Sequence, residues 1–247
     1  MSDLRTDHAL FRLRDAFPRA RRDDTLPPGQ RAISTFPRYG IARPDPPVPA
    51  HPMIQIMGAQ DAVLELDADA LNGFPRVRVA ADFHCVAGWT ARDLRWEGVR
   101  FRDVYDALSE RAPVTHILVV GRDGWRATLL LEDALRDDVL IADRLDGEPL
   151  PLDHGGPFRL VSPAQYGYKN VKHLVRIELH TSEPNDVVGG YFDRLLFRTL
   201  LAKHPRARVA HEERHRSMPS LTTRRIYTKL HPITYLLGYI GARRNPR

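Results

Sequence analysis

The sequence predicts a mixed α+β domain, and three observations support that prediction. Short segments with alternating or continuous apolar residues recur between residues 53 and 179 and are typical of strands. Few segments have helical spacing, and the strands do not alternate regularly with helices, which argues against a repeated βα pattern. The length of 247 residues and the hydrophobic content of 43% are ample for one medium domain with an appendage.

The individual elements follow from local patterns. Strands are expected at 53–58, 74–86, 116–120, 126–131, 139–142, 158–161 and 174–179, with a hairpin turn at 122–124 and a short helix at 132–136. The strands at 158–161 and 174–179 are expected to alternate inward and outward residues, as half-buried strands do. An amphipathic helix is expected after a turn at Trp96, because four apolar residues have the spacing i, i+3, i+4 and i+7: Phe101, Val104, Tyr105 and Leu108.

Changes in composition divide the chain into three parts. Residues 1–35 are a charged N-terminal segment. Residues 36–182 are the folded domain, which begins with an extended arm because its first residues are too rich in proline for a helix. Residues 183–247 are a helical, basic C-terminal extension.

The C-terminal extension has three predicted features. A helix is expected over 187–203, a highly charged connector over 206–216, and an apolar set over 226–240 that is surrounded by arginines and lysines. Such a segment either contacts a membrane surface or packs on its own domain or on a second copy in a homodimer.

Charge and targeting signals limit the partners and the location. The formal charge of +6 suits an anionic ligand, a nucleic acid or an acidic membrane. The basic residues are dispersed and match no recognition motif, so we expect no nucleic-acid binding. Arg21 and Arg22 are followed by Asp23 and Asp24 where an export signal needs apolar residues. No run of about 18 apolar residues is present. We therefore expect a cytoplasmic protein.

Cys85 is the only cysteine of the chain and cannot form an internal disulfide. It can serve in packing, in nucleophilic or redox chemistry, or as a metal ligand. Val77 and Val79 alternate with arginines and predict a strand that runs toward Cys85. Because Gly88 follows, the thiol is expected near a strand end, where sites are commonly built.

Two blocks of sequence around Cys85 and further downstream resemble a known family. The first contains His84-Cys85-Val86-x-x-Trp89 and then Arg95-Trp96-Glu97-Gly98-Val99. The second contains residues 145–151, His154-Gly155-Gly156-Pro157-Phe158-Arg159-Leu160-Val161 and Tyr166-Gly167-Tyr168-Lys169-Asn170-Val171-Lys172. Over residues 50 to 181 they resemble the molybdopterin-binding domain of the sulfite-oxidase superfamily. The resemblance is to its bacterial branches, which include the catalytic subunit of the periplasmic methionine-sulfoxide reductase.

The resemblance implies a sulfite-oxidase-type fold of mixed sheets, a molybdenum–molybdopterin cofactor and ligation of the metal by Cys85. A soft thiolate suits a metal that the pterin dithiolene also holds. The positions that match the cofactor-contacting residues of the family are His154, Arg159, Lys169, Asn170, Val171 and Lys172, with Arg38 and Tyr39 of the arm as further contacts. A guanidinium supplies a planar fork and an ammonium a point charge for the phosphate. Ser162-Pro163 resembles a helix start whose N–H groups would help to hold an anion.

Each of these residues also has a structural interpretation. Arg159 could be a strand residue that faces solvent, Lys169 could be unrelated to the cofactor, and Arg38 and Tyr39 could belong to ordinary arm packing. Alternation favours a structural role for His84, and Trp89 and Trp96 are expected to pack in the core or at a turn. His211 and His215 are spaced four apart, but no third metal ligand is evident, which favours a solvated charged face.

The departures from the family bear on the substrate. Residues 86–91 contain none of the arginines by which sulfite oxidases hold sulfite, which argues against sulfite. No haem signature is present, so electrons must be exchanged with a separate protein or carrier. The leading prediction is an oxidoreductase that transfers an oxygen atom to or from a small molecule. The alternatives are a non-catalytic binding or scaffold module at a membrane surface, and a thiol-redox protein.

Overall fold

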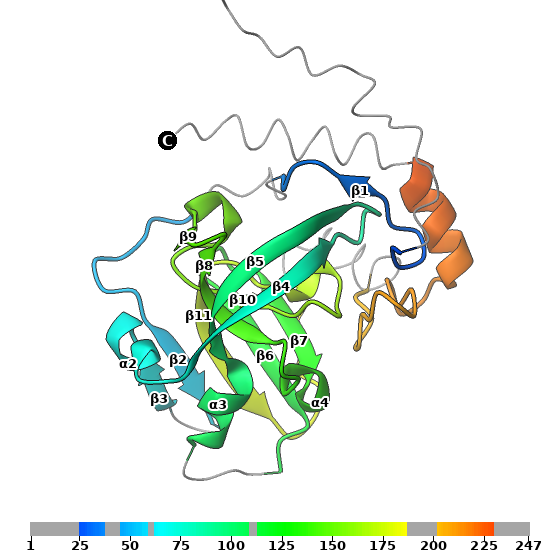
Figure 1. Cartoon of the computed structure of the whole chain (residues 1–247). Helices are drawn as coiled ribbons and strands as arrows, with labels where there is room; N and C mark the ends of the chain where they lie inside the picture. Colours follow the sequence, from blue (N-terminus) through cyan, green and yellow to red (C-terminus); the bar gives the residue numbers. More distant parts are fainter. Residues whose placement is uncertain (1–24, 38–44, 59–61, 109–112, 187–201, 230–247) are drawn as a thin grey trace, which may run out of the picture.

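The computed structural model describes residues 25–37, 45–58, 62–108, 113–186 and 202–229. Two β-sheets form its centre, and a few short helices lie at their margins (Figure 1). This arrangement confirms the predicted α+β class, because strands dominate and no regular βα alternation occurs in the described residues.

The first sheet is built around the long strand β5 (Thr90–Arg100). β4 (Arg76–His84) pairs antiparallel along one edge of β5. On the other edge, β1 (Ala32–Ile33) pairs parallel near its start, and β8 (Leu140–Leu145) pairs antiparallel near its end. β8 continues the sheet to β9 (Glu148–Pro149) and β10 (Arg159–Val161).

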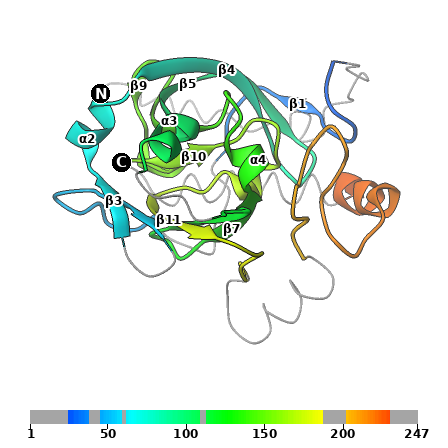
Figure 2. The same ribbon diagram turned by 90° about the horizontal axis from the view of Figure 1, so that it is seen from below.

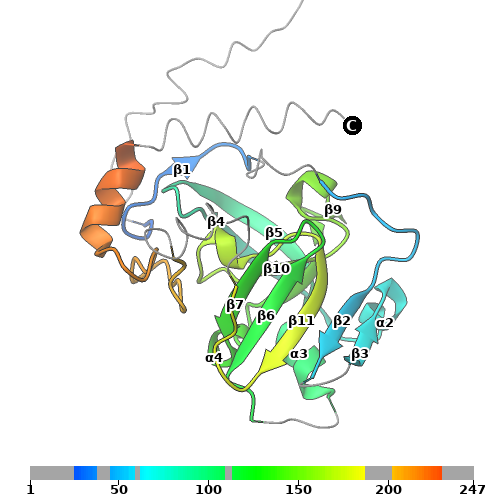
Figure 3. The same cartoon turned by 180° about the vertical axis from the view of Figure 1, so that it is seen from behind.

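The second sheet has the order β3-β2-β11-β6-β7 (Figure 3), and Figure 2 shows β3, β11 and β7 of this sheet from below. Its members are β3 (Ala62–Leu66), β2 (Ile54–Met57), β11 (Leu174–His180), β6 (His116–Gly121) and β7 (Arg126–Leu130). β11 pairs parallel with β2 and antiparallel with β6, so the last strand of the domain lies at the centre of the sheet.

The helices are short and sit at connections between strands. They are α2 (Ala68–Asn72), α3 (Phe101–Asp106), α4 (Leu131–Ala134) and the 3-10 turns η1 (Leu152–His154) and η2 (Gly167–Lys169). Asp67 caps α2 by accepting a hydrogen bond from the backbone N–H of Ala70 at 2.8 Å. α3 buries Phe101, Val104 and Tyr105, as its spacing predicts.

Buried apolar side chains form two main clusters. The larger cluster joins both sheets and includes Ile54, Phe101, Ile117 and Ile177. The smaller cluster lies in the first sheet and contains Cys85 with Trp89, Trp96 and neighbouring strand residues. The cysteine of the predicted site is therefore part of a core and not of the surface.

Most predicted strands are confirmed, but three details were wrong. Trp96 lies in the middle of β5 and not in a turn. All three residues of β10 are buried, so this strand does not alternate between core and solvent. No helix begins at Ser162, whose N–H instead donates to the Asn170 side chain at 2.6 Å.

Parts of both predicted terminal segments pack on the domain. β1 joins the first sheet, and residues 202–216 form a loop that leads into helical residues 220–229 beside β1 (Figure 1). The predicted helix over 187–203 and most of the apolar set at 226–240 lie outside the described residues. None of the helices described is long and apolar enough to span a membrane.

Candidate active site around Cys85

Cys85 follows the last residue of β4 and opens a tight loop to β5. The Cys85 N–H donates to the Trp89 carbonyl at 2.8 Å, and the Gly88 N–H donates to the Cys85 carbonyl at 2.9 Å. Gly88 has φ +93, and a Cβ atom there would lie 3.0 Å from the Gly29 carbonyl oxygen. This loop therefore requires glycine at position 88, for backbone conformation and for space.

The thiol of Cys85 is buried, with 5% of the residue exposed. Burial raises the pKa of Cys85 to about 12, while a backbone hydrogen bond from Ala87 and the charge of Arg214 act in the opposite direction. A free thiolate is therefore disfavoured at neutral pH, whereas coordination to a metal would deprotonate the thiol outright. This environment suits a ligand better than a redox-active thiol.

A chain of hydrogen bonds connects His84 with the N-terminal segment. The Thr90 hydroxyl donates to Gln30 Oε1 at 3.1 Å, so it accepts from His84 Nδ1 at 2.9 Å. Burial lowers the pKa of His84, which favours the neutral ring with its proton on Nδ1. Gln30 Nε2 also donates to the Cys85 carbonyl at 3.2 Å. His84 thus has the structural role that alternation favoured, and Gln30 is a contact that sequence reasoning missed.

Arg214 reaches the cysteine loop from the C-terminal segment. Its fully buried guanidinium donates to the carbonyls of Val86 and Gly29, the latter at 3.3 Å. It also lies over the rings of Tyr166 and Tyr227, at 5.0 and 5.6 Å from their centroids. Sequence reasoning missed this residue, because nothing distinguishes it from the other arginines of the charged connector.

Three buried donor atoms near this loop have no hydrogen-bond partner among the described residues. They are Trp89 Nε1, Tyr166 Oη and Arg214 Nε. Trp89 belongs to the Cys85 cluster, and Arg214 contacts the loop itself. Unpaired buried donors are costly in a folded protein and often mark the place of a bound group. A buried thiol with three such donors near its loop fits a cofactor that brings a metal and hydrogen-bond acceptors.

Arg159 is buried and holds two loops together. It donates to the His154 carbonyl at 2.7 Å and to the Asn170 carbonyl at 3.1 Å, and its guanidinium lies over the rings of Phe83 and Trp96. Burial lowers the pKa of Arg159 to about 9. The alternative of a solvent-facing strand residue is therefore wrong.

His154 and Lys172 lie near each other on the loops that Arg159 connects. The His154 ring stacks on Phe36 at 4.3 Å between centroids, which brings the start of the proline arm to this side of the site. Lys172 Nζ donates to the Asp153 carbonyl at 3.3 Å and lies 3.9 Å from Asp45. The structure thus brings together His154, Arg159 and Lys172, as the resemblance implies, although their contact with a cofactor stays a prediction.

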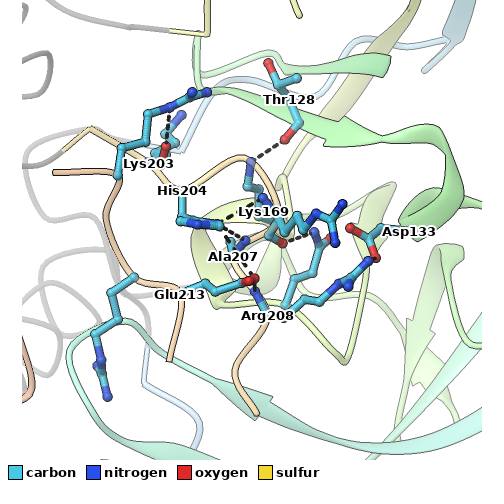
Figure 4. Close-up of polar contacts among 12 residues, drawn as sticks. Thr128, Asp133, Lys169, Lys203, His204, Ala207, Arg208 and Glu213 are labelled. Atoms are coloured by element: carbon cyan, nitrogen blue, oxygen red, sulfur yellow. Dashed lines mark hydrogen bonds and ion pairs between the residues drawn. The ribbon is translucent and has the colours of Figure 1, made fainter. Parts of the chain in front are cut away.

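The remaining predicted residues occupy different surroundings. The Asn170 side chain accepts from the Ser162 N–H and donates to the Ser162 and Tyr166 carbonyls, each at 3.3 Å. Val171 is buried in the larger cluster. Lys169 points to the second sheet, where it donates to the Thr128 carbonyl (Figure 4). Burial lowers the pKa of Lys169 to about 7. Arg38 and Tyr39 lie outside the described residues.

The paired histidines of the connector lie in different surroundings. His215 Nε2 is 2.9 Å from the Tyr227 hydroxyl, and the residue is buried, so the predicted solvated face is wrong for this side chain. His211 is exposed in a turn. Within the described part of the chain, no three His, Cys, Asp or Glu side chains are grouped for metal binding.

Comparison with known proteins identifies the family. The model of the oxidoreductase molybdopterin binding domain matches residues 44–188, more than half of the chain. The chain belongs to this family. It is therefore a molybdopterin-dependent oxidoreductase of the sulfite-oxidase superfamily, with molybdenum–molybdopterin as cofactor, as the two sequence blocks predict.

Relatives differ in how much of their length the chain covers. The uncharacterized oxidoreductase YuiH of Bacillus subtilis is 31% identical over 158 residues, which are 62% of this chain and 78% of that protein. The mitochondrial sulfite oxidase of Rattus norvegicus is 29% identical over 148 residues, but only 27% of its length is covered. The putative protein-methionine-sulfoxide reductase subunit YedZ1 of Azospira oryzae is 27% identical over 125 residues, 46% of its length.

Among solved structures, the sulfane dehydrogenase SoxCD from Paracoccus pantotrophus is similar at a TM-score of 0.47 and 21% identity. The match covers 53% of this chain and 38% of that one.

Proposed function

We propose that this protein transfers an oxygen atom to or from a small molecule at a molybdenum–molybdopterin centre ligated by Cys85. The observation that carries the proposal is the buried Cys85 thiol, near whose loop donors of Trp89, Tyr166 and Arg214 have no partner among the described residues. A purely structural core cysteine would not need such donors, because unpaired buried polar groups destabilise a fold.

Each residue of the site would have a separate role. The Cys85 sulfur would ligate the metal, and the bound cofactor supplies the redox chemistry of the transfer. Arg159 fixes the backbones of His154 and Asn170, so these loops are held in place before the cofactor binds. His154 and the Lys172 ammonium lie on these loops, where they would meet the pterin and its phosphate.

A substrate other than sulfite is favoured by one observation. The six residues after Cys85 contain no arginine.

The proposal includes a separate electron partner, because the sequence carries no haem signature. A cytoplasmic location, a homodimer and contact of the C-terminal segment with a membrane surface remain predictions. Fractionation of cells, light scattering of the purified protein and binding to anionic vesicles would test them separately.

Metal and pterin analysis tests the central claim. The full chain and its Cys85→Ala variant would be purified from a host that makes the cofactor, and molybdenum and released pterin would be measured. We expect near-stoichiometric metal in the wild type and strong depletion in the variant. Val99→Ala, a buried truncation in the larger cluster, is the matched control and should keep its metal.

Two results would contradict the proposal. Wild-type metal content in a folded Cys85→Ala protein would exclude ligation by this thiol. A well-folded wild type without molybdenum or pterin would instead favour the scaffold module. A peroxide-dependent disulfide between two chains would favour the thiol-redox protein.

A further inference from the structure

We propose that Arg214 is a positioning residue for the proposed metal ligand. In this view, it locks the Cys85 loop through Val86 and places a permanent positive charge at the loop that carries the sulfur. The metal-related part of this inference rests on the function proposed above. The mechanical part concerns only the protein chain and can be tested without cofactor.

The first argument is that Arg214 connects segments that are remote in sequence. Its two terminal nitrogens donate to the carbonyls of Val86 and Gly29, which lie 128 and 185 residues away in sequence. Gly29 has φ +70, and a Cβ atom there would lie 2.6 Å from Arg214 Nη2. Only a glycine leaves room for the guanidinium at this position. We call the contacts of Arg214 with the carbonyls of Val86 and Gly29 the clamp. The clamp joins the N-terminal segment, the cysteine loop and the C-terminal segment.

The second argument is that the guanidinium is held from several sides. Tyr166 and Tyr227 contribute their rings, and the Tyr168 hydroxyl donates to the Arg214 carbonyl at 2.9 Å. A planar, rigid fork can satisfy two carbonyls and stack on aromatic rings at once, which a lysine ammonium cannot do. The position of Arg214 is therefore fixed well enough for this residue to hold the Cys85 loop in one conformation.

The third argument concerns charge. Glu212 lies 4.0 Å from Arg214 but only 2.7 Å from Arg224, so one carboxylate serves two arginines. The three side chains keep a net positive charge, with Arg214 and Glu212 buried and Arg224 partly exposed, and the charge of Arg214 acts to lower the pKa of Cys85. A fixed cation beside a thiolate ligand stabilises added negative charge, including that of an electron taken up by the metal.

The fourth argument is that the segment carrying Arg214 is anchored independently of the clamp. Arg208 donates to Asp133 at 2.7 Å, the Val209 N–H donates to the Ala164 carbonyl at 3.0 Å, and His204 contacts Glu213 (Figure 4). Arg208→Met would loosen this docking without touching the cysteine loop. It is therefore a matched control for Arg214→Met, with the same change of residue in the same segment.

Hydrogen–deuterium exchange tests the clamp in the full chain, with and without cofactor. The amides of Cys85 and Gly88 are hydrogen-bonded within the loop and that of Thr90 to the Arg31 carbonyl, so all three can be followed directly. We expect Arg214→Met to accelerate their exchange roughly tenfold or more, since two buried carbonyls lose a charged donor. Arg214→Lys should accelerate it less, and Arg208→Met should leave it near the wild-type rate. Equal acceleration in both methionine variants, or none, would overturn the clamp.

Redox titration of the loaded enzyme tests the charge. The reduction potential of the metal, followed by electron paramagnetic resonance, should fall in Arg214→Met and stay near wild type in Arg214→Lys and Arg208→Met. An unchanged potential in Arg214→Met would overturn the electrostatic role. Should Arg214→Met not fold, the exchange rate of Arg214→Lys decides, since wild-type exchange there would overturn the clamp. A protein without metal would fail the proposed function but leave the exchange experiment valid.

Discussion

The two main core clusters of this protein differ in the polar groups that are buried around them. The larger cluster joins both sheets through apolar side chains, and the two buried atoms on its elements that are unpaired within the described part of the chain, Asp133 Oδ2 and Arg176 Nε, belong to side chains that form ion pairs with Arg208 and Glu178. Around the smaller cluster, Trp89, Tyr166 and Arg214 bury donors that have no partner among the described residues, and Arg159 is buried beside aromatic rings. The first arrangement favours the stability of the fold. The second lowers the stability of the cofactor-free protein and leaves buried donors for a bound cofactor.

Truncation in the larger cluster should have the largest effect on stability. Phe101 is fully buried in α3, so Phe101→Ala should lower the free energy of unfolding by about 3–5 kcal/mol, because a large cavity replaces packed atoms. Denaturant titration would measure this, and the molybdenum content of the folded fraction should stay unchanged. A selective loss of metal at unchanged stability would contradict the view that the larger cluster serves stability and not cofactor binding.

The buried Lys169 should make stability depend on pH. Its pKa in the folded protein is lowered to about 7, whereas that in the unfolded chain is near the ordinary 10.5. Between these values the unfolded chain binds more protons, so stability should rise with pH, by at most about 1.4 kcal/mol per pH unit. Lys169→Met should flatten the curve between pH 7 and 10. Parallel curves for variant and wild type, from denaturant titrations at several pH values, would contradict this assignment.

Removal of the hydroxyl of Tyr166 and of Tyr168 should change the stability of the protein in opposite directions. The Tyr166 hydroxyl has no partner among the described residues, so Tyr166→Phe should stabilise the cofactor-free protein by about 1 kcal/mol and weaken its retention of cofactor. The Tyr168 hydroxyl donates to the Arg214 carbonyl, so Tyr168→Phe should destabilise the cofactor-free protein by a similar amount.

Thermal unfolding without cofactor and cofactor loss on dilution would measure both effects. Destabilisation by Tyr166→Phe would show that its hydroxyl already has a partner within the protein.

An exposed ion pair should have the smallest effect. Arg95 and Asp146 lie 3.3 Å apart with side chains that are 73% and 46% exposed. Arg95→Gln should change the free energy of unfolding by no more than about 0.5 kcal/mol, because water screens such pairs. A larger loss in denaturant titration would mean that the β5 surface contributes to the first sheet more than its exposure suggests.

The strands that could be predicted are those with a regular pattern. β6 and β11 were predicted from continuous or alternating apolar residues. β5 was missed because its alternation is interrupted: Asp93 has φ +56, and the register shifts between Glu97 and Gly98. Such irregularities flip the side-chain order, so a period of two is no longer visible in the sequence.

The same division holds for the site. The sequence by itself determined the fold class, the family and the cysteine, because these depend on composition, local periodicity and motifs of adjacent residues. Only the tertiary structure decided what surrounds the thiol. Gln30 comes from the N-terminal segment and Arg214 from a connector that looks like solvated surface, while Arg159 proves to be buried. Contacts between residues 55 or 128 positions apart depend on how the sheets and segments pack, and no local sequence pattern predicts them.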